Sequence, residues 1–555
     1  MVKSVVCEEI LEGLRNGLVK DKVDLNKLKL TVVRKYKGKF PTNADVAACA
    51  SVEDLKLFGK LLSIKPIRTL SGVAPVAVMS KPKKCPHGAC IMCPSNVDCN
   101  IPQSYTGKEP ATRRAIRNKF DPYLQVFNRL EQYVAIGHCP EKVELIVMGG
   151  TFPSFPKKYQ KDFVMFCLKA MNDFSKLFFK NGMVDIVKFN KFFELPGNIS
   201  SDERVKSIQK RVLFLKKKGK ASLSKEQDNN EMSVIKCVGL TVETRPDYGM
   251  LEHGNFLLEL GTTRVELGVQ SVYDDILERI ERGHTVQDTI NSIRILKDLG
   301  FKINAHYMPG LPGVDKKRDL MGMRMLFETP LFQPDMLKIY PCMVVPNSKL
   351  YKIWKKGKFK PLTTAKAAKL IAEFKKFVPE YVRIMRVQRD IPTYMTSAGV
   401  GMTNLRQYIF ENLNPKCRCI RCREIGRSDG KVEDYELKTQ FYYASHGHEF
   451  FISAEVSDAI VGFCRLRFPS QSLRKEINDD SALIRELHVY GQSTPIGEKG
   501  DIQHQGVGRS LLGEAERIAR TYYKKKIVVI SGVGVRGYYK KFGYKRQGPY
   551  MVKRL

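Results

Sequence analysis

The stretch Cys85-Pro86-His87-Gly88-Ala89-Cys90-Ile91-Met92-Cys93 decides the fold, because it places three cysteines in one short loop at the spacing C-x4-C-x2-C. Soft thiolate ligands bind iron–sulfur clusters, and three of them leave one iron of a four-iron cluster without a protein ligand. Such an iron is open to a substrate or a cofactor. The spacing alone also permits a zinc knuckle completed by His87 or Cys99.

Around this loop, short β-rich apolar runs alternate with helical stretches. The runs cover residues 73–79, 143–148, 237–242, 264–269, 302–307 and 336–340. This alternation predicts an α/β fold with a parallel sheet, either open or a partial (βα)6 barrel. A barrel carries its active site at the C-terminal ends of its strands. We therefore expect the residues that follow the runs to line a site: Gly149, Gly150, Thr151, Glu243, Arg245 and Gln270.

The rest of the chain predicts three further parts. Residues 1–75 have amphipathic and basic helical patterns, which predict a small basic helical domain. Within the α/β domain, residues 76–395, we expect residues 176–232 to be a basic, partly disordered insertion. A linker, residues 396–430, leads to residues 431–555, which predict an α+β domain around one strong helix, residues 508–521.

Charge and composition limit the function classes. The chain has 555 residues, with 94 Lys and Arg against 58 Asp and Glu, and a net charge of +36. This excess predicts a polyanionic partner, and a generally lysine-rich solvated surface is the alternative. Because no long apolar stretch is present and the first twenty residues carry glutamates, we expect neither a membrane span nor a secretory signal. Bunched cysteines without such a signal predict metal sites and a cytoplasmic location.

A second group of cysteines lies in the linker. Cys417, Cys419 and Cys422 have the spacing C-x-C-x2-C, which predicts a structural zinc site that stabilises the domain junction. The fourth ligand stays open, because His446, His448 and other cysteines are all available. A metal-free cysteine-rich loop is the alternative.

The strong C-terminal helix opens with a glycine-rich sequence, Gln503-His504-Gln505-Gly506-Val507-Gly508-Arg509. Glycines let backbone amides approach a pyrophosphate, and the helix N-terminus adds partial positive charge. With the preceding run Glu486-Leu487-His488-Val489 and the following residues 537–544, this order resembles the GCN5-related N-acetyltransferase (GNAT) fold, which binds acetyl-CoA. The resemblance implies that the cofactor's pantetheine arm pairs with Glu486, Leu487, His488 and Val489. It also implies that the pyrophosphate lies at Gln505, Gly506, Val507, Gly508 and Arg509, and that Tyr539 lies near the thioester. For Tyr539 a core aromatic residue is the alternative, and for Glu486 a surface strand residue.

The first cysteine loop, followed by a strand that ends in Gly149-Gly150-Thr151, resembles the radical S-adenosylmethionine enzymes. The resemblance implies that Cys85, Cys90 and Cys93 hold a [4Fe-4S] cluster and that S-adenosylmethionine chelates the open iron. The glycine-rich turn would then bind the amino group of the cofactor. Cys99 has no role in this interpretation.

The two modules in one chain resemble the catalytic subunit of Elongator, a family that modifies the wobble uridine of tRNA. The stretches that carry this resemblance are residues 85–94, 103–110, 148–152, 485–491, 530–536 and 548–551. The family implies that a 5′-deoxyadenosyl radical takes a hydrogen from the methyl group of acetyl-CoA. The resulting carbon radical adds to C5 of uridine 34, and thioester hydrolysis leaves a carboxymethyl group. It also implies a tRNA anticodon arm as substrate, with phosphate contacts to the basic residues 1–75, the barrel rim and residues 417–423. An electron donor and contact of Lys157 with acetyl-CoA are implied as well. Elongator-like partner subunits or a homo-oligomer are further expectations.

Two other functions compete with this interpretation. A protein lysine acetyltransferase would use Glu486 and Tyr539 as base and acid, but the complete cysteine triad argues against an inactive radical domain. A nucleic-acid-binding scaffold with two structural zinc sites would explain the charge and the cysteines, but it leaves the acetyl-CoA motif without a purpose.

Overall fold

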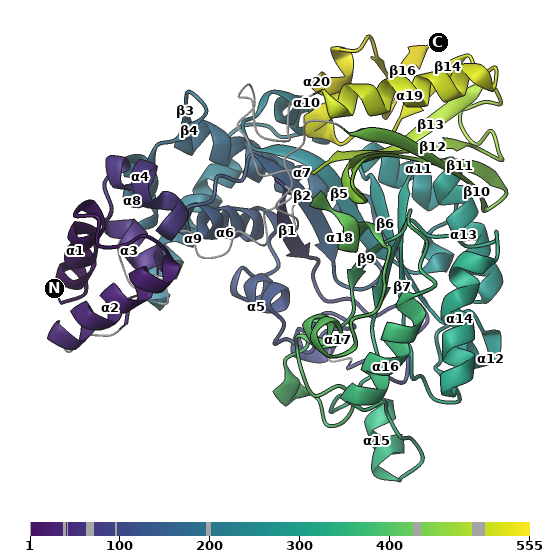
Figure 1. The fold of residues 1–555 in the computed structure, drawn as a ribbon, viewed down its shortest axis with the longest axis horizontal. Coiled ribbons are helices and arrows are strands. Elements are labelled where there is room, and N and C mark those ends of the chain that lie inside the picture. The colour runs from purple at the N-terminus through teal and green to yellow at the C-terminus, as the bar shows by residue number, and fades with distance from the viewer. Residues whose placement is uncertain are drawn as a thin grey trace.

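The computed structural model describes residues 2–36, 40–41, 43–62, 72–94, 97–195, 201–425, 435–490 and 506–555. In Figure 1 the purple N-terminal helices project to one side of a central sheet, and the yellow-green C-terminal domain covers the top of that sheet. The predicted combination of a partial barrel with an α+β domain is confirmed. Among the described residues, no helix combines the length and the apolar character needed to cross a bilayer.

The N-terminal part is helical, as predicted. Its helices are α1 (Val2–Arg15), α2 (Lys22–Tyr36), α3 (Asn43–Cys49) and α4 (Val52–Leu62). They bury a core of their own, which includes Val6, Ile10 and Leu14. Arg15 of α1 is hydrogen-bonded to Asp54 of α4 through two nitrogens, at 2.8 and 2.7 Å. This part is therefore a unit with its own core beside the α/β domain.

The central sheet is entirely parallel, in the order β1-β2-β5-β6-β7-β8-β9. Its strands are β1 (Ala74–Met79), β2 (Lys142–Met148), β5 (Lys236–Thr244), β6 (Arg264–Gln270), β7 (Lys302–Tyr307), β8 (Met336–Ile339) and β9 (Arg383–Arg386). The first six coincide with the predicted runs. The seventh, β9, was not predicted, because its four residues begin and end with arginine and show no apolar run.

Helices join these strands. They are α5 (Pro110–Arg117), α6 (Pro122–Ala135), α7 (Lys157–Phe178), α11 (Leu251–Leu260), α12 (Asp274–Arg279), α13 (Val286–Asp298), α14 (Lys316–Glu328), α15 (Lys349–Lys355) and α16 (Thr364–Lys375), followed by α17 (Leu405–Leu413) and α18 (Ile420–Arg423). Local capping fixes several starts. Thr285 and Asp288 form a reciprocal capping box at the start of α13, which satisfies amides that the helix leaves free.

The insertion is more ordered than expected. Its described residues form α8 (Ile186–Phe193), α9 (Asp202–Lys217), α10 (Leu223–Met232) and the small hairpin β3 (Phe179–Lys180) and β4 (Met183–Val184). Phe189 and Phe193 are buried against Phe174 and Phe178 of α7, with the Phe178 and Phe189 rings 5.5 Å apart. The described residues of this segment are helical and packed, unlike the expected surface excursion, because lysines and polar residues between these phenylalanines hid the apolar positions; residues 196–200 lie outside the described residues.

The C-terminal domain is a seven-stranded sheet in the order β10-β11-β12-β13-β14-β16-β15. The strands are β10 (Glu436–Ala444), β11 (Gly447–Val456), β12 (Ala459–Phe468), β13 (Ser481–Val489), β14 (Lys526–Val529), β15 (Lys545–Gln547) and β16 (Tyr550–Arg554). The strong helix is α19 (Val507–Thr521), and a short helix, α20 (Arg536–Lys540), follows β14. All strand pairs are antiparallel except β13 with β14.

The two large domains touch backbone to backbone. The turn before α20 packs onto β5, where a Cβ on Gly532 would lie 2.1 Å from the carbonyl oxygen of Val238. Nearby, Glu231 of α10 pairs with Arg536 at 3.1 Å and with Lys540 at 2.8 Å. The insertion therefore helps to hold the C-terminal domain on the sheet.

Candidate active site

The cysteine loop follows β1 and is fixed from both sides by backbone hydrogen bonds. Ile91 donates to the carbonyl of Ile280 at 3.1 Å and accepts from the amide of Leu350 at 2.8 Å. Its neighbours Cys90 and Met92 are also buried, in an apolar cluster with Ile276 and Ile280. The loop is therefore held in place by the protein itself.

Hydrogen-bond donors lie beside two of the three sulfur atoms. The amide of Ser104 lies 3.3 Å from Cys93 Sγ, and Arg282 Nη1 lies 3.6 Å from Cys90 Sγ. Burial raises the pKa of the Cys93 thiol to about 11. A thiol of this kind needs the positive charge of a metal centre to bind as thiolate at neutral pH.

The distances between the sulfur atoms distinguish the two cysteine groups. Zinc with Zn–S bonds of about 2.3 Å brings its sulfurs within about 4 Å of one another. Within the described part of the chain, the sulfurs of Cys417, Cys419 and Cys422 all lie within 4.8 Å of one another, whereas those of Cys85, Cys90 and Cys93 do not. The first loop therefore fits a wider, multi-iron cluster better than a single zinc ion.

The predicted glycine turn lies directly beside this loop. Gly149 and Gly150 directly follow β2 with φ of +121° and +94°, which residues with a side chain rarely adopt. A Cβ on Gly149 would lie 2.4 Å from Ser80 Oγ, and one on Gly150 would lie 3.8 Å from Cys85 Sγ. Thr151 Oγ1 is 3.7 Å from the same sulfur. The glycines thus leave a space against the cysteine loop that a larger residue would occupy.

The ends of β5 and β6 complete the surroundings of the loop. Arg245 is held by Asp247 at 2.9 and 2.8 Å and by the carbonyl of Gly283 at 2.7 Å. Gln270 has φ of +70°, a strained value of the kind found at functional sites. Arg245 Nη1 and Gln270 Oε1 are buried, and neither has a hydrogen-bond partner within the described part of the chain. Buried polar atoms without partners are costly, so these positions fit a polar cofactor such as S-adenosylmethionine.

Two residues of this site were missed by the sequence analysis. Gln103 accepts from the amide of Cys85 and donates to Gly88 at 2.7 Å, and so shapes the loop. Arg282 contacts Cys90 across a separation of 192 residues. Gln103 lies in a stretch that carries the Elongator resemblance, but the resemblance assigned no function to this residue. Nothing in the sequence indicated that Arg282 belongs to the site.

In the C-terminal domain, β13 and β14 pair only from Ser481 to Ile484 and from Lys526 to Val529. Beyond that point β13 continues through Glu486, Leu487, His488 and Val489 without β14 beside it. The strands therefore splay, which leaves backbone groups free to pair with an extended ligand such as pantetheine.

The helix that follows is also suited to a phosphate group. Gly506 caps α19 with φ of +87°, and a Cβ on Gly508 would lie 2.6 Å from the hydroxyl of Tyr538. Val507 is buried and Arg509 begins the exposed side of the helix. Gln505 lies outside the described residues. Tyr539 is buried in α20, and burial raises the pKa of its hydroxyl.

Glu486 is engaged by two bases. Its carboxylate lies 2.9 Å from Arg465 Nε and 3.8 Å from Lys302 Nζ of the radical domain. Burial opposes its ionisation, but Lys302 and Arg465 outweigh it and lower the pKa of Glu486. A carboxylate held ionised in this way is a weak proton acceptor, which argues against a direct lysine acetyltransferase mechanism.

Lys157 is not brought to the other acetyl-CoA residues by any described contact. It begins α7 on the surface, 2.8 Å from Glu252 of α11 and over the ring of Phe256. Its predicted contact with acetyl-CoA stays a prediction.

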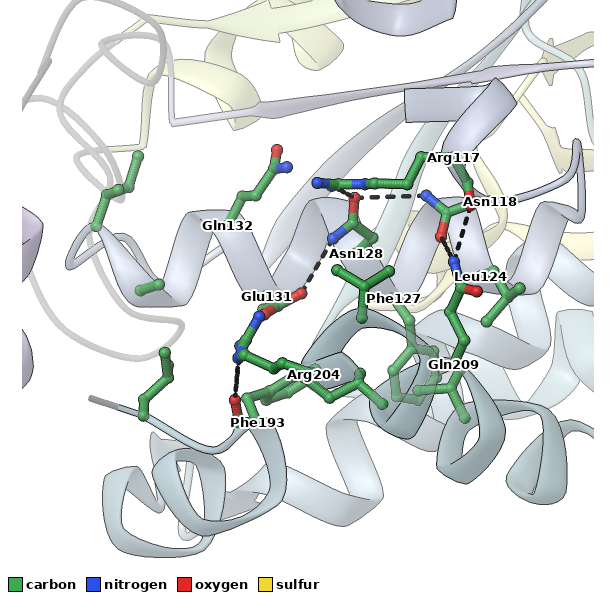
Figure 2. A pocket seen from close by; sticks show the side chains of 16 residues that line it. Arg117, Asn118, Leu124, Phe127, Asn128, Glu131, Gln132, Phe193, Arg204 and Gln209 are labelled. Carbon is green, nitrogen blue, oxygen red and sulfur yellow. Dashed lines mark hydrogen bonds and ion pairs between the residues drawn. The ribbon is translucent and has the colours of Figure 1, made fainter. Parts of the chain in front are cut away.

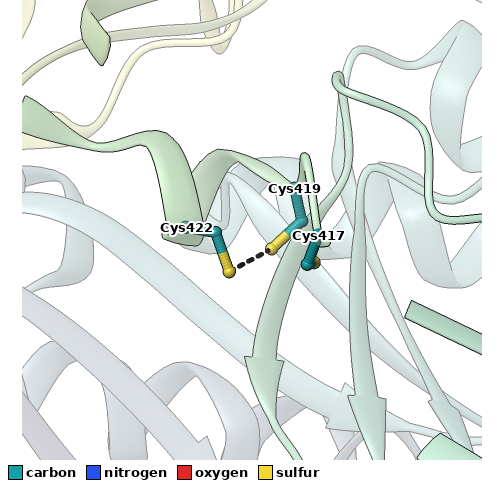
Figure 3. Close-up of side chains that lie close together, drawn as sticks. All are labelled: Cys417, Cys419 and Cys422. Atoms are coloured by element: carbon teal, nitrogen blue, oxygen red, sulfur yellow. Dashed lines mark hydrogen bonds between the residues drawn. The ribbon is translucent and has the colours of Figure 1, made fainter. Parts of the chain in front are cut away.

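The second cysteine group lies at the start of α18, as Figure 3 shows, with Cys419 Sγ 3.6 Å from Cys422 Sγ. Neither His446 nor His448 joins it; the ring of His448 packs against Phe441 and Tyr443. The neighbouring arginines bind carboxylates of both domains: Arg423 lies 3.0 Å from Glu380 and close to Glu455. The group therefore lies at the domain junction, as predicted.

A cavity of about 140 Å³ lies away from all these residues, between α6 and α9 (Figure 2). Its wall includes the buried ion pair of Arg204 with Glu131 at 2.8 Å and the side chains of Phe127 and Phe193. The cavity marks where the insertion packs on the barrel and adds nothing to the predicted site.

The chain matches four family models along its length. The ELP3 N-terminal domain covers residues 3–70 and the Radical SAM superfamily residues 79–321. The Radical_SAM C-terminal domain covers residues 334–414 and the Acetyltransferase (GNAT) family residues 419–544. The order of these models agrees with the order of the domains in the structure.

Curated relatives match over nearly their full length. The tRNA uridine(34) acetyltransferase of Methanocaldococcus jannaschii is 42% identical over 99% of this chain and 97% of its own. The human Elongator complex protein 3 is 40% identical over 99% and 96%. The solved structure of Methanocaldococcus infernus Elp3 lacking its N-terminus matches with a TM-score of 0.70 and 39% identity, over 87% of this chain and 100% of that one. The chain therefore belongs to the Elongator complex protein 3 (Elp3) family, whose members join a radical S-adenosylmethionine domain to a GNAT domain.

Proposed function

We propose that this protein is a tRNA uridine(34) acetyltransferase that joins the acetyl carbon of acetyl-CoA to C5 of the wobble uridine and leaves a carboxymethyl group. One observation supports the proposal: the cysteine loop with its glycine turn and the splayed strand β13 lie in two domains that are packed together by fully buried ion pairs. Forming a carbon–carbon bond at an unactivated methyl group calls for both modules.

When bound, the [4Fe-4S] cluster and S-adenosylmethionine supply a 5′-deoxyadenosyl radical. Cys85, Cys90 and Cys93 hold the cluster, while Gly149 and Gly150 leave room beside it. Arg245 and Gln270 present their unpartnered polar atoms to the cofactor, and Thr151 contacts the loop. Glu243 lies at the end of β5 beside them, held by the hydroxyl of Tyr105 at 2.9 Å.

In the GNAT domain, β13 pairs with the pantetheine arm along residues 486–489. The start of α19 receives the pyrophosphate, because its free amides and dipole favour negative charge. Tyr539 lies by the thioester. Buried as it is, its hydroxyl stays protonated at neutral pH and is therefore a hydrogen-bond donor.

The partners follow from the same chemistry. The anticodon arm of tRNA is the polyanion that the net charge of +36 attracts. Because the protein contacts its phosphates, binding depends on the salt concentration. An external electron donor reduces the cluster. We also infer a cytoplasmic location from the reduced thiols, and assembly with partner subunits or with a second copy.

The test uses the full chain, reconstituted anaerobically, with reductant, S-adenosylmethionine, methyl-deuterated acetyl-CoA and unmodified tRNA. Mass spectrometry should find deuterium in 5′-deoxyadenosine and labelled carboxymethyluridine in the tRNA. Acetylated protein lysines without need for S-adenosylmethionine, and with unchanged tRNA, would overturn the proposal in favour of a lysine acetyltransferase.

We further propose that Cys417, Cys419 and Cys422 bind zinc. Cys419→Ser should remove about one zinc per chain while iron is retained, because the two cysteine groups are separate. Cys139→Ser, which changes an exposed cysteine, is the control and should leave both metals unchanged. Elemental analysis measures both, and equal zinc content in Cys419→Ser and the parent would contradict the zinc site.

A further inference from the structure

The inner face of the half-barrel carries hydrogen-bonding side chains where barrels usually carry aliphatic ones. In the strand register, Glu243 of β5 lies beside Glu266 of β6, which lies beside Asn304 of β7. His306 of β7 lies beside Lys338 of β8. The alternate residues of the same strands, such as Val265 and Ile303, enter the apolar core instead. The polar row is therefore a property of this face alone.

Glu266 organises the row. Its Oε1 accepts from Asn304 Nδ2 at 3.0 Å, and its Oε2 contacts His306 Nε2 at 3.1 Å and the ammonium of Lys338. The row reaches the cysteine loop through Glu243, which accepts from the hydroxyl of Tyr105 at 2.9 Å. Tyr105 follows Ser104, whose amide contacts Cys93 Sγ. The row thus lies one side chain away from the predicted radical site.

A metal ion does not suit this row, although Glu243, Glu266 and His306 have ligand atoms within 4.8 Å of one another. The ammonium of Lys338 already lies near both carboxylates, in contact with Glu266 and 3.9 Å from Glu243. Burial opposes ionisation of Glu266, but the charge of Lys338 outweighs it and keeps the pKa of Glu266 well below its usual value. The row therefore has one ammonium against two carboxylates, with Arg264 3.7 Å from Glu266, and this absence of excess positive charge leaves little attraction for a phosphate.

What the row lacks is a neutral partner with both donors and acceptors. Asn304 is fully buried, yet its Oδ1 has no hydrogen-bond partner among the residues that the structure describes. Such an atom calls for a donor. In the same row Lys338 offers N–H donors that Glu266 does not use, whereas His306 donates its N–H to Glu266; the two side chains keep 10% and 12% of their exposure. The edge-on contact of Tyr340 with His306, at 5.3 Å between ring centres, adds an aromatic wall.

We propose that Glu266, Asn304, His306 and Lys338 form the recognition site for the target nucleobase, a uracil. Asn304 Oδ1 accepts the imide N3–H and Lys338 donates to a carbonyl oxygen. Glu266 positions both, and it also holds the ring of His306 beside them. Cytosine presents a lone pair at N3 and is rejected, because it leaves Asn304 Oδ1 facing another acceptor. An acetyl thioester has no donor for Asn304. The inference rests on the proposed function and names the groups that choose its base.

The test compares anticodon stem-loops that carry uridine, 3-methyluridine, 2-thiouridine or 4-thiouridine at position 34, with the rate of carboxymethylation in a single turnover as readout. The full-length protein should lose about tenfold or more with 3-methyluridine, which has no N3–H, and with one of the thio bases, because sulfur is a weak acceptor. If 3-methyluridine reacts as fast as uridine, the proposal is wrong, and this outcome needs no variant.

Variants identify the partner groups. Lys338→Gln should slow the reaction of uridine about tenfold. The thio base that slows the parent protein should cause no further loss in this variant, because the variant and the thio base remove the same hydrogen bond and their effects are not additive. In Asn304→Ala, 3-methylation of the uridine should likewise cause no further loss. Lys338→Arg should react with uridine faster than Lys338→Gln does. Lys349→Gln, which breaks the ion pair with Glu281 outside the row, is the matched control and should keep the full sensitivity.

Iron content and thermal midpoint establish that each variant is folded. If the rate losses caused by the variant and by the modified base are additive in folded Lys338→Gln and Asn304→Ala, the row has only a structural role. If the parent protein modifies uridine 34 and these couplings are missing, only this inference fails. If the parent leaves uridine 34 unchanged, the proposed function fails first.

Discussion

At the cysteine loop, the small size of a glycine matters as much as the chemistry of the neighbouring side chains. Gly150 has φ of +94° and stands where a Cβ would meet Cys85 Sγ at 3.8 Å. Gly137, between α6 and β2, has a comparable φ of +81°, but a Cβ there would have nothing within 4 Å. The two glycines therefore share backbone strain and differ in what lies next to them.

This pair yields a prediction. Gly150→Ala and Gly137→Ala should each destabilise the fold by about 1 kcal/mol, because alanine is strained at positive φ. Only Gly150→Ala should also weaken S-adenosylmethionine binding and 5′-deoxyadenosine formation, since its methyl group enters the cofactor space. Thermal unfolding and product analysis by mass spectrometry measure both effects. Equal 5′-deoxyadenosine yields in the two variants would contradict the placement of the cofactor.

Among the elements, α14 is tied to the barrel rim by a buried acid in its first turn. Asp319 accepts from the amide of Gly310 at 2.7 Å, in the turn after β7. Burial raises the pKa of Asp319 to about 7, whereas an exposed aspartate has a value near 3.8. Between these two values the folded chain binds a proton that the unfolded chain has released. Stability from this group therefore falls as the pH rises through that window.

Asp319→Asn should remove this dependence, because the amide oxygen still accepts from Gly310 and carries no charge. The free energy of unfolding of the variant, relative to the parent, should increase by on the order of 3 kcal/mol from about pH 4 to about pH 8. Thermal shift measurements across this range check it. A difference that stays constant with pH would show that Asp319 ionises normally in the folded protein.

At the scale of the whole molecule, the two catalytic domains are joined through buried charge. Asp335, which precedes β8, binds Arg485 of β13 at 2.6 and 2.8 Å, and Arg485 also binds Glu449 at 2.8 Å. Arg467 and Asp298 form a second pair across the junction at 2.6 Å. All these side chains are fully buried, so each depends on its partners for solvation.

Asp335→Ala should therefore destabilise the protein by about 3–5 kcal/mol, because it removes the carboxylate that two nitrogens of the buried Arg485 bind and leaves Glu449 as the one carboxylate on that side chain. Glu328→Ala, which breaks an exposed i,i+4 pair with Arg324, should cost less than about 1 kcal/mol. Chemical denaturation of the two variants gives the comparison. Similar losses would mean that water reaches the junction.

Close backbone packing makes the same junction rigid. Gly532→Ala would place a methyl group against the carbonyl oxygen of Val238, which cannot turn aside as a side chain does. We expect a loss of about 1–3 kcal/mol and a fall in carboxymethyluridine, while 5′-deoxyadenosine formation is kept. Gly513→Ala in α19, with nothing within 4 Å, is the control and should leave both products unchanged. If Gly532→Ala keeps full tRNA modification, the fixed domain arrangement is not required.

Local patterns in the sequence determined the fold class, both cysteine groups and the six main strands. Apolar runs and close cysteine spacings act within about ten residues, so they are visible along the chain. Strand β9 was missed because arginines stand at both of its ends: Arg386 is exposed, and Arg383 is half-buried through its partners Tyr490 and Glu424 on other elements. The insertion was misjudged for the same reason, since its phenylalanines become a core only against α7.

Only the tertiary structure decided which groups meet. The contact of Arg282 with Cys90, the pairing of Glu486 with Lys302, and the row around Glu266 each join segments far apart in the chain. The pKa and the hydrogen-bonding capacity of a buried group depend on such neighbours, and no local pattern encodes them. The chemical modules of this protein can be read from its local sequence motifs. The residues that those modules present to each other depend on packing.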